Sequence, residues 1–361
     1  MRERDGGGGI ATPREVRLGI NGFGRIGRAV FRAVHKHSLG SVVTVNDRHG
    51  DGENLRYLLM RDSLYGRFPA VVEARGNGTW TVEGRAVQVL DKQGIADVDW
   101  AGHGVELVVD AASTHESHDT YRKVLAGGVR SVVVTSSLAA ETDCTIVCGV
   151  NEAMYRPDRH RVVGASTCDA IALAPVVRQL EDNFGLVGGF VITLHPWLSH
   201  QNLLDAPLQR SALSPRDWQE YGIGRAAAMN LIPKATSLVD ALTDVLPEVA
   251  PRLGAISFRV PTPAVCSAHV VATLRRPTSV AQVNEAFERS AAAPGSTVGY
   301  EVEHQVSTDF LGEERAVVVD GRWTQVHDRR TASLIVWYDN EWGYATNVVR
   351  LVRLLTSDGS A

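Results

Sequence analysis

A cysteine and an aspartate stand next to each other where a helix is predicted to begin. In residues 164–175, GASTCDAIALAP, a segment rich in valine and glycine gives way to a helical pattern at Cys168 and Asp169. The free N–H groups at a helix N-terminus favour a thiolate, whereas an adjacent carboxylate opposes it. Taken alone, the pair is more simply explained as a small buried cysteine followed by an ordinary acidic residue of the first helical turn.

A histidine further along the chain could supply the base that such a thiol needs. His195 ends a predicted strand at residues 190–194, so it could lie beside Cys168 at one edge of the same domain. A nucleophile, a base and a bound nicotinamide cofactor are what an enzyme needs to oxidise an aldehyde through a covalent adduct. Because a lone histidine at a strand end is more often structural, this interpretation depends on finding the cofactor site.

A dinucleotide site is predicted near the N-terminus. Gly22, Gly24 and Gly27 form a G-x-G-x-x-G pattern between a predicted strand at residues 16–20 and a predicted helix. In such a turn the first glycine allows the tight bend, the second lets the backbone approach a pyrophosphate, and the third packs helix on strand. The diphosphate then binds at the helix N-terminus. The alternative is a glycine-rich turn that binds no ligand.

A carboxylate follows at the spacing that this site requires. Asp47 lies 20 residues after Gly27 at the end of a predicted strand, where it would hydrogen-bond the adenosine ribose hydroxyls. Since a carboxylate there would repel a 2′-phosphate, the sequence favours NAD over NADP. The adjacent Arg48 leaves NADP open, because a guanidinium could bind the extra phosphate.

The elements that must position these residues alternate between strands and helices. Apolar runs typical of buried parallel strands occupy residues 16–20, 42–45, 105–111, 132–134, 146–150 and 162–165. Helices are predicted between them at residues 27–37 and 121–126. The second half is predicted to hold a helix from residue 168 to about 180, strands at 190–194, 255–260, 268–274 and 333–338, and helices at 237–245, 281–292 and 342–355.

The predicted fold class is therefore α/β, in two domains. Residues 15–167 are expected to form a Rossmann-type NAD-binding domain with a parallel sheet, completed by a C-terminal helix at 341–358. Residues 168–340 are expected to form an α+β catalytic domain with a mixed or antiparallel sheet and helices on one face. Residues 1–14, with four consecutive glycines, are expected to be a flexible tail.

Composition excludes several other classes of function. The chain has 361 residues and a net charge of −4 without a long basic run, so no nucleic-acid or membrane partner is expected. No apolar run approaches the roughly 18 residues of a membrane span, and no signal peptide precedes the first domain, which indicates a cytoplasmic protein. The four cysteines include no C-x-x-C pair, so neither a disulfide scaffold nor a metal site is expected.

Several longer motifs identify a family. The chain resembles glyceraldehyde-3-phosphate dehydrogenase from residue 16 to about 355. The matching motifs are INGFGRIGR (20–28), VND (45–47), RDSLYGRF (61–68), IVCGVNE (146–152), FRVPTP (258–263) and WYDNEWGY (337–344).

The resemblance implies roles for individual residues. Cys168 would be the nucleophile and His195 the base, and Asn340 would hold the nicotinamide carboxamide. The other cofactor contacts that it implies are Arg25, Ile26, Ser113, Thr135 and Tyr344. The substrate or phosphate contacts that it implies are Thr167, Asp169, Arg225, Thr236, Ser237 and Arg259. Family members are usually homotetramers, in which an S-shaped loop reaches a neighbour's cofactor.

The chain departs from the family pattern around the nucleophile. The family motif Ser-Cys-Thr-Thr-Asn-Cys is replaced by Thr-Cys-Asp-Ala-Ile-Ala at residues 167–172, so Asp169 stands where a threonine normally helps to bind phosphate. Leu198 replaces a second phosphate-binding threonine, and Lys234 stands where a small residue is usual. The S-shaped loop, at about 201–224, is longer than is typical.

These residues predict an NAD-dependent aldehyde dehydrogenase that forms a thioacyl intermediate on Cys168. The acyl acceptor is inorganic phosphate if Lys234 neutralises Asp169, and water if Asp169 repels phosphate. The alternatives are a non-phosphorylating dehydrogenase of a different phosphorylated or phosphonate aldehyde, and an NAD-binding sensor without turnover.

Overall fold

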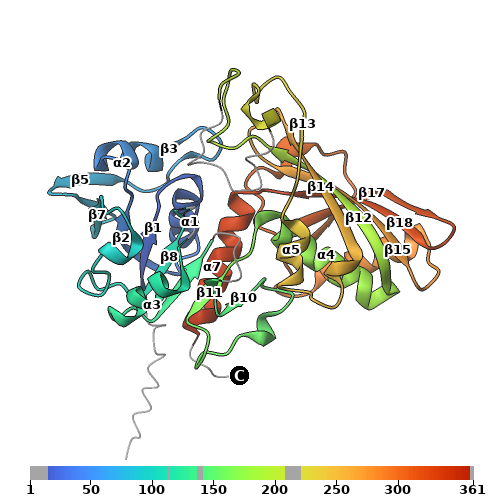
Figure 1. The fold of residues 1–361 in the computed structure, drawn as a ribbon, viewed down its shortest axis with the longest axis horizontal. Helices are drawn as coiled ribbons and strands as arrows, with labels where there is room; N and C mark the ends of the chain where they lie inside the picture. The colour runs from blue at the N-terminus through green and yellow to red at the C-terminus, as the bar shows by residue number, and fades with distance from the viewer. Residues whose placement is uncertain (1–14, 113, 115, 136–140, 208–220, 358–361) are drawn as a thin grey trace, which may run out of the picture.

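The chain forms two large β-sheets side by side, with the C-terminal helix between them (Figure 1). The structure is a computed structural model that describes residues 15–112, 114, 116–135, 141–207 and 221–357. The predicted tail at residues 1–14 and the predicted cofactor contact Ser113 therefore lie outside the described residues, as do most of the predicted S-shaped loop and residue 358.

The first sheet contains nine strands within the described residues, in the order β10-β11-β9-β8-β1-β2-β7-β6-β5. The strands from β10 to β7 in this order run parallel, and β6 and β5 extend the sheet with antiparallel pairs. Their bounds are β1 (Val16–Asn21), β2 (Gly40–Asn46), β5 (Val72–Gly76), β6 (Thr79–Val82), β7 (Arg85–Leu90), β8 (Leu107–Asp110), β9 (Ser131–Val134), β10 (Cys144–Thr145) and β11 (Val162–Gly164). The predicted parallel core is thus confirmed, and the antiparallel extension is an addition.

In the described part of the first half, helices and a small two-stranded ribbon surround this sheet. They are α1 (Arg25–Lys36), α2 (Gly52–Met60) and α3 (His118–Ala126), with the ribbon formed by β3 (Arg61–Asp62) and β4 (Gly66–Arg67). The side chains of Asp51 and Ser117 accept hydrogen bonds from backbone amides three residues later, which fixes the starts of α2 and α3. Helix α2 was not predicted. Only its Leu55 and Leu59 are buried, so the sequence carries a weak apolar pattern there.

The predicted strand at residues 146–150 is wrong. Strand β10 ends at Thr145, and a turn follows. The Asn151 side chain accepts a hydrogen bond from Val147 N and donates one to Thr145 O, and Val150 N donates to Val147 O. These local bonds use the backbone groups that a strand would need for pairing.

The second sheet is mixed and contains seven strands within the described part of the chain, in the order β13-β14-β12-β15-β18-β17-β16. The pairs β12–β14 and β16–β17 are parallel and the others are antiparallel. The bounds are β12 (Leu186–Pro196), β13 (Ile232–Lys234), β14 (Leu253–Val260), β15 (Cys266–Leu274), β16 (Val298–Glu301), β17 (Val317–His327) and β18 (Thr331–Tyr338).

Helices cover one face of this sheet. They are α4 (Cys168–Phe184), α5 (Leu238–Thr243) and α6 (Val280–Ala292). On the other face Phe190 and Leu194 remain exposed. The last helix, α7 (Trp342–Thr356), leaves the second sheet and packs against α1 and β9 of the first (Figure 1). No described helix is long and apolar enough to span a membrane.

The turn after β1 depends on glycine at one position. Gly22 has a φ of +83°, and a Cβ there would lie 2.4 Å from the Ala112 Cα atom. We expect Gly22→Ala to lower the free energy of unfolding by roughly 2–4 kcal/mol, from the disfavoured φ and the clash together. Urea denaturation measures the change.

Gly24 offers a matched control for that variant. It has a φ of −68°, and a Cβ there would meet nothing within 4 Å, so Gly24→Ala should cost less than about 1 kcal/mol. Equal losses for the two variants would contradict the assignment of strain to Gly22.

Candidate active site

A cleft of about 640 Å³ lies between the two sheets and collects most of the predicted site residues. Those that line it are Gly22, Gly24, Arg25, Ile26, Asp47, Thr135, Thr167, Cys168, Asp169, His195, Thr236, Ser237, Arg259, Asn340 and Tyr344. Two predicted residues lie elsewhere. Gly27 packs beneath the turn, and Arg225 is exposed and forms an ion pair with Asp205.

The glycine-rich turn presents backbone to the cleft. A Cβ on Gly27 would lie 2.0 Å from the Gly22 carbonyl oxygen, so helix and turn approach as closely as glycine permits. Helix α1 begins after Gly24 without a side-chain cap, and Arg25 and Ile26 open its first turn at the cleft. Free amides at a helix N-terminus suit a diphosphate, so this half of the cleft fits a dinucleotide.

Asp47 is held at the edge of this half by two backbone amides. Its carboxylate accepts hydrogen bonds from Phe23 N at 2.7 Å and from His49 N at 2.9 Å. Arg48 and His49 are exposed beside it, with Arg48 Nε 2.8 Å from His49 Nε2. The carboxylate is thus fixed at the end of β2, with a guanidinium beside it, as the sequence predicts.

The structure also contains a buried polar network below the turn, which the sequence did not predict. Asn21 donates to Asp110 at 2.9 Å and accepts from Asn46 at 2.8 Å, so the ends of β8, β1 and β2 are joined. The Tyr121 hydroxyl donates to the same aspartate at 2.8 Å. Burial raises the pKa of Asp110. The sequence does carry a feature from which this network could have been predicted, because each of three adjacent parallel strands ends in a polar residue.

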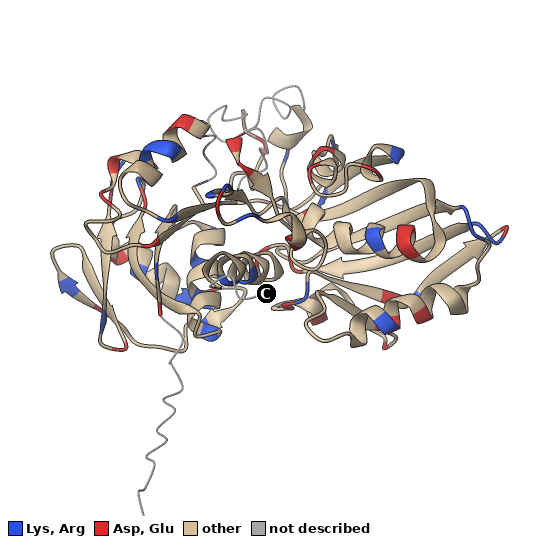
Figure 2. Ribbon diagram, turned by 90° about the horizontal axis from the view of Figure 1, so that it is seen from below, with Lys and Arg blue, Asp and Glu red and all other residues tan. Residues whose placement is uncertain are grey.

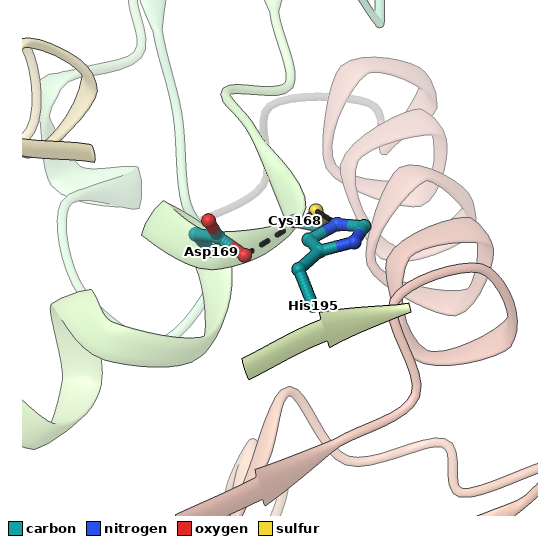
Figure 3. A group of neighbouring side chains, drawn as sticks. All are labelled: Cys168, Asp169 and His195. Atoms are coloured by element: carbon teal, nitrogen blue, oxygen red, sulfur yellow. Dashed lines mark hydrogen bonds between the residues drawn. The ribbon is translucent and has the colours of Figure 1, made fainter. Parts of the chain in front are cut away.

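The second half of the cleft brings the predicted nucleophile and base together (Figure 3). Cys168 is the first residue of α4, and His195 is the penultimate residue of β12. The Cys168 Sγ atom lies 3.6 Å from His195 Nε2, within hydrogen-bonding range for sulfur. Thr167 caps α4, because its side chain accepts a hydrogen bond from Ala170 N at 3.2 Å.

The neighbours of His195 decide which of its nitrogens faces the thiol. Nδ1 lies 2.8 Å from the carbonyl oxygen of Pro196, which can only accept, so the ring proton is on Nδ1 and Nε2 can receive the thiol proton. Burial lowers the pKa of His195 to about 4, and the cationic Arg259 and Lys234 act in the same direction. The imidazole is therefore a neutral acceptor near neutral pH.

Asp169 faces the thiol instead of pointing away from it. Its Oδ1 atom lies 3.7 Å from Cys168 Sγ and accepts a hydrogen bond from the Tyr338 hydroxyl at 2.8 Å. Burial and then the Asp169 charge raise the pKa of Cys168, while Arg259 and the Asp169 backbone amide oppose the rise. Tyr338 is not among the predicted site residues, because its contact with Asp169 spans 169 residues of chain.

Two residues near the C-terminus line the cleft and form hydrogen bonds to its walls. The Tyr344 hydroxyl lies 2.9 Å from the carbonyl oxygen of Thr135 and 3.0 Å from that of Ser166, so α7 fixes the segment that leads into Cys168. Ser166 has a φ of +61°, a strained value of the kind found at functional sites. The Asn340 side chain accepts a hydrogen bond from Val265 N at 3.2 Å, which orients its amide.

Cationic residues lie on the strands next to the base. Arg259 is paired with His195 in the register of β14 and β12, and Lys234 of β13 is paired with Ser257 of β14. Thr236 and Ser237 follow at the start of α5. The pairing of Lys234 with Asp169 stays a prediction, and the described contacts of that carboxylate include Tyr338 and Cys168.

Comparison with known proteins matches both halves of the chain. Residues 16–118 match the model of the glyceraldehyde 3-phosphate dehydrogenase NAD binding domain, and residues 167–340 match that of the C-terminal domain. The glyceraldehyde-3-phosphate dehydrogenase of Streptomyces coelicolor is 35% identical over 93% of this chain and 97% of its own length. Glyceraldehyde-3-phosphate dehydrogenase 1 of Bacillus subtilis is 36% identical over 95% of this chain and 99% of its own.

Proposed function

The chain belongs to the glyceraldehyde-3-phosphate dehydrogenase family, and from that premise we propose that it oxidises an aldehyde with NAD through a thioacyl intermediate on Cys168. The observation that carries this proposal is the 3.6 Å approach of Cys168 Sγ to His195 Nε2 in a cleft whose other half fits a dinucleotide. When bound, NAD accepts a hydride from the substrate carbon.

Cys168 and His195 would perform the covalent step. Sγ forms a bond to the carbonyl carbon as Nε2 of His195 takes the thiol proton, and the carbonyl oxygen becomes an oxyanion. The backbone N–H of Cys168, in the first turn of α4, would help to hold that oxyanion. Loss of hydride from the same carbon leaves a thioester on Sγ, which an acceptor then releases as acid or acyl phosphate.

The charge of the cleft supports an anionic substrate. Arg259 and Lys234 lie close enough to His195 to lower the pKa of its imidazole, so they place positive charge where a phosphate group of the aldehyde would bind. Thr236 and Ser237 line the same wall. We therefore favour a phosphorylated aldehyde, with a phosphonate aldehyde as the alternative that presents similar charge.

An aldehyde panel tests the proposed function. Purified enzyme is incubated with NAD and single aldehydes, with and without phosphate or arsenate, and NADH formation is followed by absorbance. We expect turnover with at least one phosphorylated or phosphonate aldehyde. If no aldehyde of the panel yields NADH or acylates Cys168 while NAD still binds, the proposal fails in favour of an NAD-binding sensor.

Cofactor choice is expected to depend on Asp47. Because its carboxylate is fixed by Phe23 N and His49 N, it would repel a 2′-phosphate, and kcat/KM should be higher with NAD than with NADP. Asp47→Ala should lower the ratio of kcat/KM with NAD to kcat/KM with NADP by roughly tenfold, which corresponds to about 1.4 kcal/mol. Steady-state kinetics with both cofactors measure it, and equal kcat/KM values in the unaltered enzyme would refute the role.

The acceptor of the acyl group is expected to depend on Asp169. A carboxylate about 6 Å from a phosphate costs roughly 3 kcal/mol per unit charge at an effective dielectric constant near 20, whereas water carries no such charge. The contact of Asp169 with Cys168 Sγ favours hydrolysis on this ground. NADH formation should then be independent of phosphate, and Asp169→Thr should acquire phosphate stimulation.

The contrary outcome is equally clear. Saturable dependence on phosphate in the unaltered enzyme, with an acyl phosphate as product, would reject hydrolysis and support neutralisation of Asp169 by another charge such as Lys234. Asp169→Asn removes the charge with little change of shape, and it separates the effect of charge from that of the threonine hydroxyl.

The assembly is proposed to be a homotetramer, as is usual in the family. The face of the second sheet that the helices leave open carries the apolar residues Phe190 and Leu194, 47% and 44% exposed, which supports a contact between copies. Mass determination in solution tests the assembly.

Basic and acidic residues are interspersed over both halves of the molecule (Figure 2). The proposed location is the cytoplasm, and cell fractionation tests it.

A further inference from the structure

The three side chains in Figure 3 have a property that aldehyde oxidation does not require. Cys168, Asp169 and His195 each offer a different type of metal-ligand atom, and these atoms all lie within 4.8 Å of one another. The sequence predicts no metal site, because the spacing of the cysteines fits no structural zinc site. These donors come instead from the first turn of α4 and the end of β12.

The distances agree with a tetrahedral ion. Zinc binds thiolate at about 2.3 Å, imidazole at about 2.0–2.1 Å and carboxylate at about 2.0–2.2 Å, which places sulfur about 3.6 Å from the other two donors. Cys168 Sγ lies 3.6 Å from His195 Nε2 and 3.7 Å from Asp169 Oδ1. The imidazole and carboxylate donors lie within 4.8 Å of each other, and a tetrahedral ion would hold them about 3.4 Å apart, so the ion would draw these two donors together.

Hydrogen bonds outside this triangle orient two of the donors. Nδ1 of His195 is bound to the Pro196 carbonyl oxygen at 2.8 Å, which directs the lone pair of Nε2 toward the thiol. The Tyr338 hydroxyl donates to the Asp169 carboxylate at 2.8 Å. Both are typical of the bonds that hold metal ligands in place. All three donors line the cleft, so a fourth coordination position is open to water.

We propose that Cys168, Asp169 and His195 form a reversible inhibitory site for Zn²⁺ or another thiophilic divalent ion. Binding forms an Sγ–metal bond and releases the thiol proton to solvent, while Nε2 and a carboxylate oxygen each donate a lone pair. The nucleophile is then blocked until the metal leaves. The third donor is Asp169, which stands where the family motif has a neutral threonine. A carboxylate, which binds divalent metal ions well, thus replaces a hydroxyl, which binds them poorly.

Cobalt titration of the full-length enzyme tests the site without any substrate. Co²⁺ should bind once per chain and give the visible bands of a tetrahedral ion together with a thiolate-to-cobalt charge-transfer band. Cys168→Ser should lose the charge-transfer band, whereas the control Cys144→Ser, whose cysteine lies on β10 of the other sheet, should keep it. Absence of the band in the unaltered enzyme, or its survival in Cys168→Ser, would overturn the proposal.

Calorimetric titration with Zn²⁺ tests the other donors. We expect Asp169→Asn to weaken binding at least tenfold and Tyr338→Phe to weaken it by a smaller factor. NAD binding by each variant verifies that it is folded. If folded Asp169→Asn binds Zn²⁺ with an unchanged Kd, the carboxylate is not a ligand and the proposal is overturned. Bound Zn²⁺ should also protect Cys168 from iodoacetamide, and a chelator should restore its labelling.

Discussion

Cys168→Ser is expected to abolish aldehyde oxidation while NAD still binds. Serine is a far weaker nucleophile than cysteine, and loss of a nucleophile lowers kcat by about 10⁴–10⁶-fold in enzymes with covalent intermediates. The variant should keep the fold, because the hydroxyl is smaller than the thiol and Thr167 still caps α4. Stopped-flow or steady-state NADH formation measures the loss.

Cofactor affinity is the control for this variant. The glycine-rich turn and Asp47 belong to the first sheet and α1, whereas Cys168 begins α4, so the Kd for NAD should change by less than about twofold, or 0.4 kcal/mol. Full aldehyde oxidation by the serine variant would refute the role of Cys168. Loss of both turnover and NAD binding would indicate misfolding, and Cys168→Ala would then decide the question.

His195→Asn is expected to slow turnover by about 10²–10⁴-fold near neutral pH, the usual contribution of a general base. Asparagine can keep a hydrogen bond to the Pro196 carbonyl oxygen, so the variant removes the proton acceptor with little change in packing. Since burial lowers the pKa of His195 to about 4, the base is almost entirely unprotonated near neutral pH.

The pH dependence separates a base from a structural residue. Burial and Asp169 raise the pKa of Cys168, so the thiolate population and the activity should increase as the pH increases above neutral. Without the base, reaction depends on thiolate formed by solvent, and the deficit of His195→Asn should shrink as the pH rises. A loss below tenfold at pH 7, or a deficit that does not change with pH, would contradict the assignment.

The parallel strands and the glycine-rich turn could be predicted, because both depend on residues close together in the sequence. The valine-rich runs gave the parallel strands, and the three glycines gave the turn, because a positive φ at Gly22 and the close approach at Gly27 restrict those positions to glycine. Asp47 could be placed from its spacing alone, since it directly follows β2, the strand next to the turn. The family resemblance placed Asn340 and Tyr344, which no local pattern could relate to Cys168.

Contacts between distant residues could not be predicted in this way. Tyr338 ends β18, where it is paired with Cys266 of β15, and it reaches Asp169 across 169 residues of sequence. Apolar residues at 146–150 suggested a strand, but the Asn151 side chain holds a turn there. The family resemblance implied that Arg225 contacts the substrate, whereas the structure pairs it with Asp205, and it does not line the cleft.

The position of α7 has a consequence for the order in which the molecule can be completed. This helix covers α1 and β9, and its Tyr344 holds the carbonyl oxygens of Thr135 and Ser166. A ribosome makes α1 long before α7, so the surface of α1 that α7 covers stays exposed until residues 342–356 have left the exit tunnel. The nascent N-terminal half therefore cannot reach its final packing until α7 has been made, and the segment that presents Cys168 is fixed only after that helix has docked.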